Sequence, residues 1–276
     1  MNQYTLATLF LCVAATALHA QEATEAWRFS LHGGGQHIAH DTELPGLPEV
    51  PSCAPGFTDG SGNGIALGIA AERAIVPSLS AGLRVLYQTY GATLTARDQQ
   101  LVSAMHDTVT ATFEYTIETT HRAVGTELIL GYEPLRGLRV LAGARLDVIT
   151  GASFHQQEAI VSPGTIRFEN DRRTRNEADG EIATTASTHL AVLAGLRYDL
   201  ALDRARRLLL SPEVLAWQGL GDLDPSAPWS LRGVRFGVSA SYVLFGTESA
   251  SPIEPGTIED TSVPQGGNEV RPVPGR

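Results

Sequence analysis

Histidine is the first residue type in this chain that could carry chemistry. His32, His37 and His40, followed by Asp41, are a possible metal-ligand set near one end of an apolar segment. Successive side chains of a strand point to opposite faces, so His32 and His37 would lie on opposite sides of it. We therefore predict no metal or cofactor here and interpret these residues as ordinary polar residues at the rim of the fold.

His121 and His189 are the candidate general bases of the chain. A catalytic Ser/His/Asp set assembles in space, and no spacing in this sequence identifies a partner for either histidine. His189 also lies on the polar side of its segment, which is typical of a packed interior group. We predict no catalytic residues, with an enzyme built around one of these histidines as the alternative.

The first twenty residues contain no Asp, Glu, Lys or Arg, and an apolar run extends over residues 5–17. Leu18, His19 and Ala20 then precede Gln21 and Glu22, a pattern that predicts a secretory signal peptide over 1–20 with cleavage after Ala20. A buried N-terminal helix is the alternative interpretation.

The two cysteines do not suggest a site. Cys12 follows Leu11, which is too large for the residue before a lipidated cysteine, and cleavage at residue 20 would remove it. Cys53 would then be the only cysteine of the exported chain, so no internal disulfide is expected. We interpret Cys53 as a loop residue, because no base is recognisable beside it.

Charge and hydropathy restrict the class of protein. The net charge is −10 and the isoelectric point about 5.2, which argues against a nucleic-acid partner. After the signal peptide no stretch reaches the roughly 18 apolar residues of a membrane helix. A membrane location would therefore require a closed β-barrel, which satisfies its backbone hydrogen bonds internally.

Apolar residues alternate with small or polar ones from residue 27 to residue 245, as in β-strands. The alternation divides into eight segments, near 27–38, 63–73, 79–93, 120–133, 138–150, 186–200, 207–218 and 231–245. They are roughly 10 to 15 residues long, which exceeds most soluble strands and suffices to cross a bilayer. A soluble exported β-sandwich that binds a ligand is the alternative.

The connections between segments alternate in length. Residues 74–78, 134–137 and 201–206 are short turns, whereas 39–62, 94–119, 151–185 and 219–230 are long. Outer-membrane barrels have short periplasmic turns and long outer loops, so this asymmetry predicts an eight-stranded antiparallel up-and-down barrel over 21–246. An interfacial aromatic belt should then comprise Trp27, Tyr132, Tyr198 and Tyr242, with Tyr87 at the opposite rim.

The face opposite the apolar one carries charges of both signs. Eight strands leave an interior just wide enough for side chains, so we expect these charges to pair and plug it. Our preferred pairs lie across short turns: Glu72 with Arg84, and Arg197 with Glu213. The full set is Glu72, Arg84, Glu127, Arg139, Arg145, Asp147, Arg197, Glu213 and Arg235.

Two segments fit the pattern poorly. Pro212 lies inside the seventh segment, where we expect a bulge to accommodate the missing backbone donor. Residues 108–119 also alternate, but with their apolar residues on the opposite parity to residues 122–132. We therefore predict a fourth strand that protrudes from the membrane, with a bulge near Thr119–His121 that exchanges its two faces.

Two polar regions complete the chain. Residues 167–181 are highly charged and predict a solvated outer loop, in which Arg172, Arg173 and Arg175 could contact lipopolysaccharide phosphates. Residues 247–276 mix proline with glycine, serine and glutamate and lose all apolar periodicity. They predict a disordered periplasmic tail.

The sequence resembles outer-membrane β-barrel proteins of the Bacteroidetes and Chlorobi type, loosely OmpA-like or PorT-like, over about 27–245. The resemblance rests on short motifs: LHGGG (31–35), CAPGF (53–57), GSGNG (60–64), LSAGLR (79–84), EPL (133–135) and SPE (211–213). In several such proteins a peptidoglycan-binding domain follows a proline-rich linker, whereas the given chain ends after the linker-like tail.

The resemblance implies location and fold more than activity. We expect a monomer in the outer membrane, surrounded by its lipids and lipopolysaccharide, with a structural or surface-interaction role in the cell envelope. A barrel enzyme that acts on lipid is the alternative function.

Overall fold

The computed structural model describes residues 25–47, 50–104, 107–182, 184–224 and 227–245. The predicted signal peptide and the predicted tail lie outside these ranges. Within them, no helix is long and apolar enough to span a membrane. The strands are β1 (Glu25–Leu44), β2 (Phe57–Val76), β3 (Leu79–Ala104), β4 (Asp107–Leu135), β5 (Leu138–Ser162), β6 (Thr174–Glu181), β7 (Thr188–Tyr198), β8 (Leu200–Ala201), β9 (Leu208–Gly219) and β10 (Trp229–Phe245).

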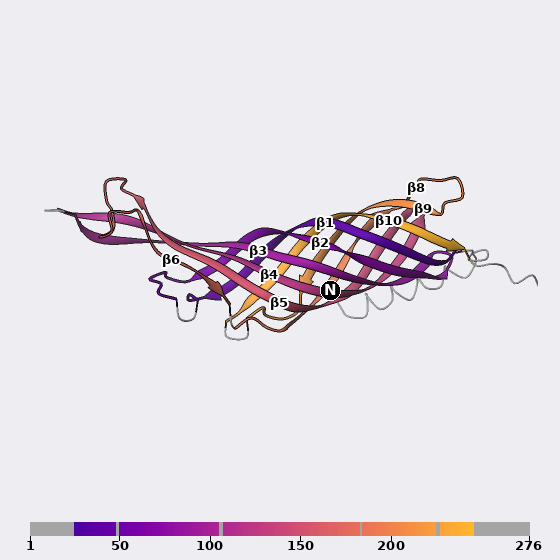
Figure 1. Ribbon diagram of the computed structural model, residues 1–276, viewed down its shortest axis with the longest axis horizontal. Coiled ribbons are helices and arrows are strands. Elements are labelled where there is room, and N and C mark those ends of the chain that lie inside the picture. The colour runs from indigo at the N-terminus through magenta and orange to yellow at the C-terminus, as the bar shows by residue number, and fades with distance from the viewer. Residues whose placement is uncertain (1–24, 48–49, 105–106, 183, 225–226, 246–276) are drawn as a thin grey trace, which may run out of the picture. The chain divides into compact units, whose positions relative to one another are not determined.

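Eight of these strands form a closed antiparallel ring (Figure 1). The ring runs β1, β2, β3, β4, β5, β7, β9 and β10, and the pairing of β10 with β1 closes it. The short strand β8 continues β7 alongside β9, and β6 pairs with β5 outside the ring. The predicted eight-stranded up-and-down barrel is confirmed.

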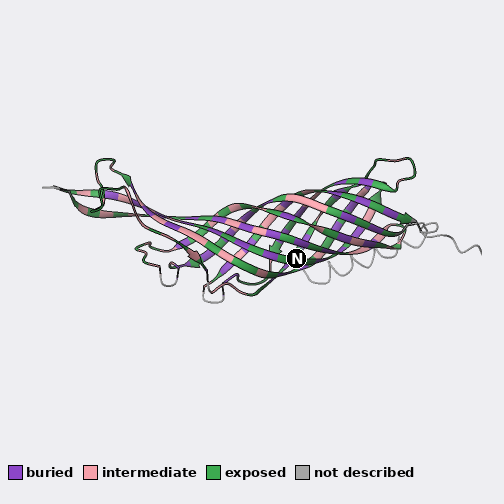
Figure 2. Cartoon of the chain, viewed as in Figure 1, coloured by how far each residue is buried: buried purple, intermediate pink, exposed green. Residues whose placement is uncertain are grey.

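Residues of the ring strands alternate between the lumen and the outer surface, as the buried and exposed stripes of Figure 2 show. The outward face in the middle of each strand is apolar and exposed, with Leu128 at 63 % exposure as an example. The lumenal face of the same strands carries buried arginines and carboxylates. A water-soluble protein has the reverse arrangement, so this band of exposed apolar side chains is built to face lipid.

A ring of polar residues bounds the apolar band at its long-loop end. Each strand contributes one outward-facing polar residue at this level: His37, Asn63, Thr89, Arg122, Thr150, Thr188, Gln218 and Arg232; Thr126 of β4 is a polar residue within the band itself. On β4 the band extends from Val124 to Tyr132. Nine residues span roughly 30 Å along a strand, or about 23 Å across a bilayer at the usual tilt, which matches the apolar height of outer-membrane barrels.

The aromatic residues lie where the sequence predicts them. Trp27, Tyr198 and Tyr242 point outward at the short-turn end of the band, as does the partly exposed Tyr132. Trp27 stacks on Phe29, and the Arg73 guanidinium lies 5.6 Å from the centre of the Trp27 ring. Tyr87 is the last outward apolar residue of β3 before the polar ring at the other end.

Much of the predicted long loops is strand. β3 and β4 pair without interruption from Leu79 opposite Tyr132 to Ala104 opposite Asp107, well past the polar ring. β5 follows β4 to Ser162, and β6 adds a further strand at its edge. We call the parts of β3, β4, β5 and β6 beyond the polar ring the outer sheet; it continues away from the closed ring in Figure 1.

The predicted bulge at Thr119–His121 of β4 is wrong. Odd-numbered residues of β4 face inward throughout, from Ala111 to Gly131, and the pairing with β3 has no register shift. The irregularity lies on β5, where Thr150 is an extra residue between the pairs Gly151–Arg122 and Ile149–Ala123. The same residues of β4 therefore face inward along the whole strand. What changes at the polar ring is the residue type on each face: the inward face turns from apolar to polar and the outward face from polar to apolar.

The predicted bulge at Pro212 is also absent. Pro212 stands opposite Val238 in an unbroken register with β10. On its other side, the pairing of β9 is interrupted between Glu213, opposite Arg197, and Leu210, opposite Leu200. The missing N–H of proline falls at this gap between β7 and β8, so no extra residue is needed.

The apolar band predicts a position-dependent effect of charge. Leu128→Arg places a cation at mid-band and should destabilise the barrel by about 2–4 kcal/mol. Thr116→Arg, on the same face of β4 but beyond the polar ring, should change stability by less than about 0.5 kcal/mol. Guanidinium unfolding in lipid vesicles measures both, and equal effects would contradict a lipid-facing band.

Candidate functional site

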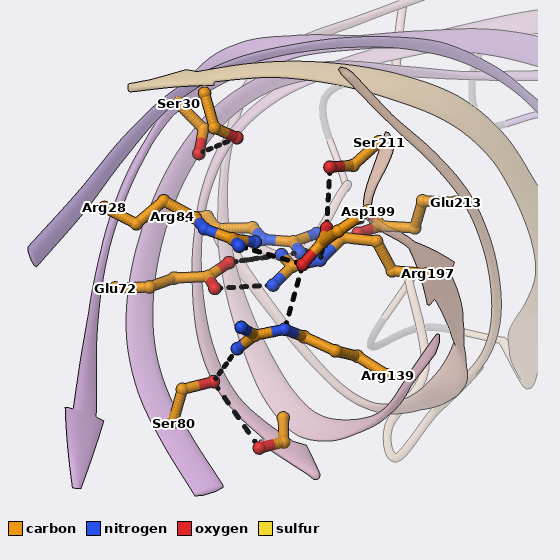
Figure 3. A network of polar contacts seen from close by, with 12 residues as sticks. Arg28, Ser30, Glu72, Ser80, Arg84, Arg139, Arg197, Asp199, Ser211 and Glu213 are labelled. Carbon is orange, nitrogen blue, oxygen red and sulfur yellow. Dashed lines mark hydrogen bonds and ion pairs between the residues drawn. The ribbon is translucent and has the colours of Figure 1, made fainter. Parts of the chain in front are cut away.

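The lumen between the two ends of the apolar band holds a continuous network of ion pairs, and Figure 3 shows the part of it around Arg84, Arg197 and Asp199. Six arginines and five carboxylates take part, and Glu133 at the short-turn end pairs with Arg139 at 3.2 Å as a sixth acid. The arginines are Arg28, Arg84, Arg139, Arg145, Arg197 and Arg235, and the five acids are Glu72, Glu127, Asp147, Asp199 and Glu213. Equal numbers of opposite charges leave this interior neutral.

The strongest pairs cross the lumen. Arg84 donates two hydrogen bonds of 2.7 Å to Glu213, which lies four strands away around the ring. Arg197 forms the matching two-bond pair with Glu72. The predicted pairs are therefore exchanged: Arg84 approaches Glu72 only to 3.8 Å, and Glu213 binds Arg84 in place of its neighbour Arg197.

Narrowness of the ring explains this exchange. Lumenal side chains on adjacent strands start parallel, about 5 Å apart at Cβ, and extend toward the axis. A long arginine therefore reaches carboxylates on the far wall with better geometry than its neighbour's. The third two-bond pair, Arg235 with Glu127 at 2.7 and 2.8 Å, follows the same rule.

Asp199 organises the short-turn end of the network. It accepts hydrogen bonds from Arg28 at 2.8 Å, Arg139 at 3.0 Å and the Ser211 hydroxyl at 2.7 Å. Arg28 and Asp199 were missed among the predicted plug residues, although both lie on the polar parity of their segments. That parity was the signal that could have identified them.

Little space is left beside the ion pairs. Two cavities border the network, one next to Arg235 and Glu213 and one next to Arg28 and Glu72. Each has a volume of about 10 Å³, which is room for one water molecule at most.

Histidine and tryptophan form the next layer toward the long loops. The Trp229 indole N–H donates to His40 Nδ1 at 2.9 Å, and His121 packs edge-on against the same indole. His189 lies 3.6 Å from Asp147 and packs against Trp217. Both candidate bases, His121 and His189, are thus lumenal and only 1 % and 2 % exposed.

The first histidine group does not form one donor set. His32 and His40 point into the lumen, whereas His37 and Asp41 point outward. His37 Nδ1 is within hydrogen-bond distance, 3.1 Å, of the Asn63 side-chain oxygen. Alternation along β1 separates these side chains, as the sequence argument expects.

Apolar side chains occupy the lumen beside the histidines and beyond them toward the long loops. Ile38, Phe57, Leu94, Ile117 and Leu231 are almost completely buried there. This layer continues as the inner face of the outer sheet, where Phe113 packs against Phe168. The outer sheet therefore has a soluble-protein arrangement, apolar within and polar without.

The highly charged segment is partly structural. Arg173 donates to the backbone carbonyls of Ile160 and Val161, and Arg175 pairs with Glu158 at 2.6 Å. The bond to Glu158 raises the pKa of Arg175, whose guanidinium lies 4.4 Å from the centre of the Phe168 ring. Of the three arginines predicted to meet lipopolysaccharide, Arg172 is exposed, whereas Arg173 and Arg175 are partly buried.

One further titratable group lies in this outer region. Desolvation raises the pKa of the Tyr115 phenol on β4 to about 12, and the Glu158 carboxylate adds to the rise. The phenol therefore stays protonated at neutral pH, and the side chain packs within the buried apolar cluster.

A histidine–carboxylate pair lies on the outer face of the outer sheet. His155 Nδ1 is 2.8 Å from Asp179 Oδ1, and Ser153 lies two residues before His155 on the same face of β5. Both members of the pair are exposed, at 43 % and 80 %. They lie on the outward face of β5 and β6, away from the lumenal cavities beside Arg28 and Arg235.

Comparison with known proteins adds structural neighbours but no family. No family model and no curated protein matches the chain. Neisserial surface protein A is 14 % identical, with 78 % of this chain and 97 % of that chain covered and a TM-score of 0.35. The outer-membrane protease OmpT of Escherichia coli is 8 % identical (83 % and 100 % covered, TM-score 0.32), and OprG of Pseudomonas aeruginosa 11 % (80 % and 98 %, TM-score 0.33).

The geometry itself defines the class of protein. A closed ring of eight strands with an apolar outer band and a charged lumen is an outer-membrane β-barrel.

The crossing pairs predict a specific double-mutant result. Arg84→Leu leaves Glu213 without its two-bond partner and should destabilise the barrel by about 3–5 kcal/mol. Adding Glu213→Leu should recover most of that loss, because an apolar pair replaces a buried ion pair with little penalty. The measurement is unfolding in detergent micelles, with Arg172→Leu as the exposed control. A loss equal to that of the control would contradict a structural role for the network.

Proposed function

We propose that this protein is a non-conducting outer-membrane barrel whose role is to anchor the outer sheet at the cell surface for envelope structure or for contact with a partner. The carrying observation is the combination of a filled lumen with strands that extend far beyond the membrane. A channel would leave its lumen open, whereas here ion pairs and an apolar layer occupy successive levels of it.

The outer sheet supports an interaction role. Its outward face on β4 is polar from Thr108 to Arg122, with threonine at every second position except Glu114, Glu118 and Arg122. β3 has no partner strand beyond Leu94 on the side away from β4, within the described residues. An open strand edge can accept an extended segment of another protein by strand addition.

We further propose that the protein acts as a monomer without catalysis. The His155–Asp179 pair supplies a base with a carboxylate, but a flat polar surface gives a substrate no pocket in which to be oriented. The motifs at 31–35, 79–84 and 211–213 favour kinship with OmpA-like or PorT-like barrel domains. That kinship agrees with a role in the envelope rather than in transport.

A conductance measurement tests the filled lumen. Protein reconstituted into planar bilayers in strong salt should give no discrete current steps. Arg84→Ala combined with Arg235→Ala removes two crossing side chains and should give flickering leak, because water can then enter the lumen. Stable steps from the unaltered protein would contradict the proposal.

Cys53 allows a direct test of orientation. It is exposed in the connection between β1 and β2 at the long-loop end. A membrane-impermeant maleimide should label it on intact cells. In a Cys53→Ser background, Ala205→Cys in the turn between β8 and β9 should be labelled only after the outer membrane is permeabilised. The opposite labelling pattern would invert the topology.

A further inference from the structure

A groove lies on the outer wall of the barrel where β7, β9, β10 and β1 run side by side. Its volume is about 690 Å³. Small residues form its floor: Ala194 and Ala216 are opposite each other on β7 and β9, and Ala39 of β1 lies beyond β10, where Gly233 is located. Val192 and Val234 complete its apolar wall.

Gly233 lets a large lumenal side chain pack directly behind the groove. A Cβ at this position would lie 2.9 Å from the Trp217 ring, which packs against the wall from the lumen. The indole therefore lies on the lumenal side of the wall, directly behind the groove. The wall at this point is only one backbone thick.

The groove ends at polar residues on the loop side. Arg232 lies between Ala39 and Gln218 in one cross-strand row, and His37 stands opposite Val234 in the next row toward the membrane. The side chains of Arg232, Gln218 and His37 belong to the polar ring that bounds the apolar band. Arg232 is exposed and has no ion-pair partner among the described residues; the outward-facing carboxylate next in register is Asp41, one row further out.

The occupant of such a groove must combine two chemistries. Its lower part faces the hydrocarbon region and suits an acyl chain, because the lining there is alanine, glycine and valine. Its upper end presents a guanidinium at headgroup level, and guanidinium binds phosphate oxygens with two hydrogen bonds. With the long loops outside, this end lies in the outer leaflet.

We propose that the groove binds the lipid A part of lipopolysaccharide, with one acyl chain along the alanine floor and a phosphate on Arg232. The inference rests on the proposed orientation of the barrel. The proposed contact with lipopolysaccharide is thus made by Arg232 of β10, and not by Arg172, Arg173 and Arg175 as the sequence predicts.

Arg122 provides a matched control. It is the only other arginine of the polar ring and lies on β4, four strands from β10 in a ring of eight and thus on the opposite side. It does not line the groove. Ala81 on β3, opposite β9 in the ring, serves in the same way for Ala216.

The experiment is native mass spectrometry of the purified full chain in detergent, titrated with diphosphorylated lipid A. Arg232→Gln should weaken lipid A binding by about tenfold, the loss of one charged hydrogen-bonding group. Ala216→Phe, which fills the groove, should weaken it at least as much. Arg122→Gln and Ala81→Phe should bind like the unaltered protein, and all variants should keep the heat-dependent gel shift of a folded barrel.

Two outcomes would overturn the proposal. One is equal binding by Arg232→Gln and Arg122→Gln. The other is binding of phosphatidylglycerol as tight as that of lipid A with the same dependence on Arg232, which would make the groove a general anionic-lipid site. Either result leaves the conductance and labelling tests of the proposed function unaffected, whereas reversed Cys53 labelling would remove the basis for both proposals.

Discussion

The satisfaction of backbone hydrogen bonds without water is the constraint on which the rest of this structure depends. In lipid an unpaired edge strand would leave a row of N–H and C=O groups exposed, so β1 must pair with β10 as well as with β2. That pairing extends from Trp27 opposite Leu244 to Thr42 opposite Trp229, over the whole height of the band. Closing a ring of eight strands then fixes a narrow lumen.

The narrow lumen determines how its charges pair. Each buried arginine must find a carboxylate, because an uncompensated charge in this environment is strongly destabilising. Opposite walls are close enough for Arg84 to reach Glu213 and for Arg235 to reach Glu127. These contacts join strands that are not neighbours in the ring, so the network also braces the barrel across its diameter.

Sequence patterns predicted the elements that depend on local periodicity. The eight ring strands, the short turns and the outward aromatics all follow from spacing along the chain, and the structure has them, whereas much of the predicted long loops is strand. The partners of Glu72 and Arg197 did not follow, because pairing across a lumen depends on strand tilt and register, which no single segment encodes. The His155–Asp179 pair was missed for the same reason: β6 lies within a segment predicted to be an outer loop.

β4 shows why an exchange of patterns need not be an exchange of faces. Its inward residues are apolar at Phe113, Tyr115 and Ile117 and then include His121 and Glu127. Its outward residues change in the opposite sense, from polar before Val124 to apolar from Val124 onward, with Thr126 as the exception. Inside the membrane the surroundings are lipid and the lumen is charged, whereas outside the membrane the surroundings are water and the interior is apolar. A straight strand that crosses this boundary must therefore invert its hydrophobic pattern. A prediction that assumes the same surroundings along the whole strand interprets this inversion as a bulge.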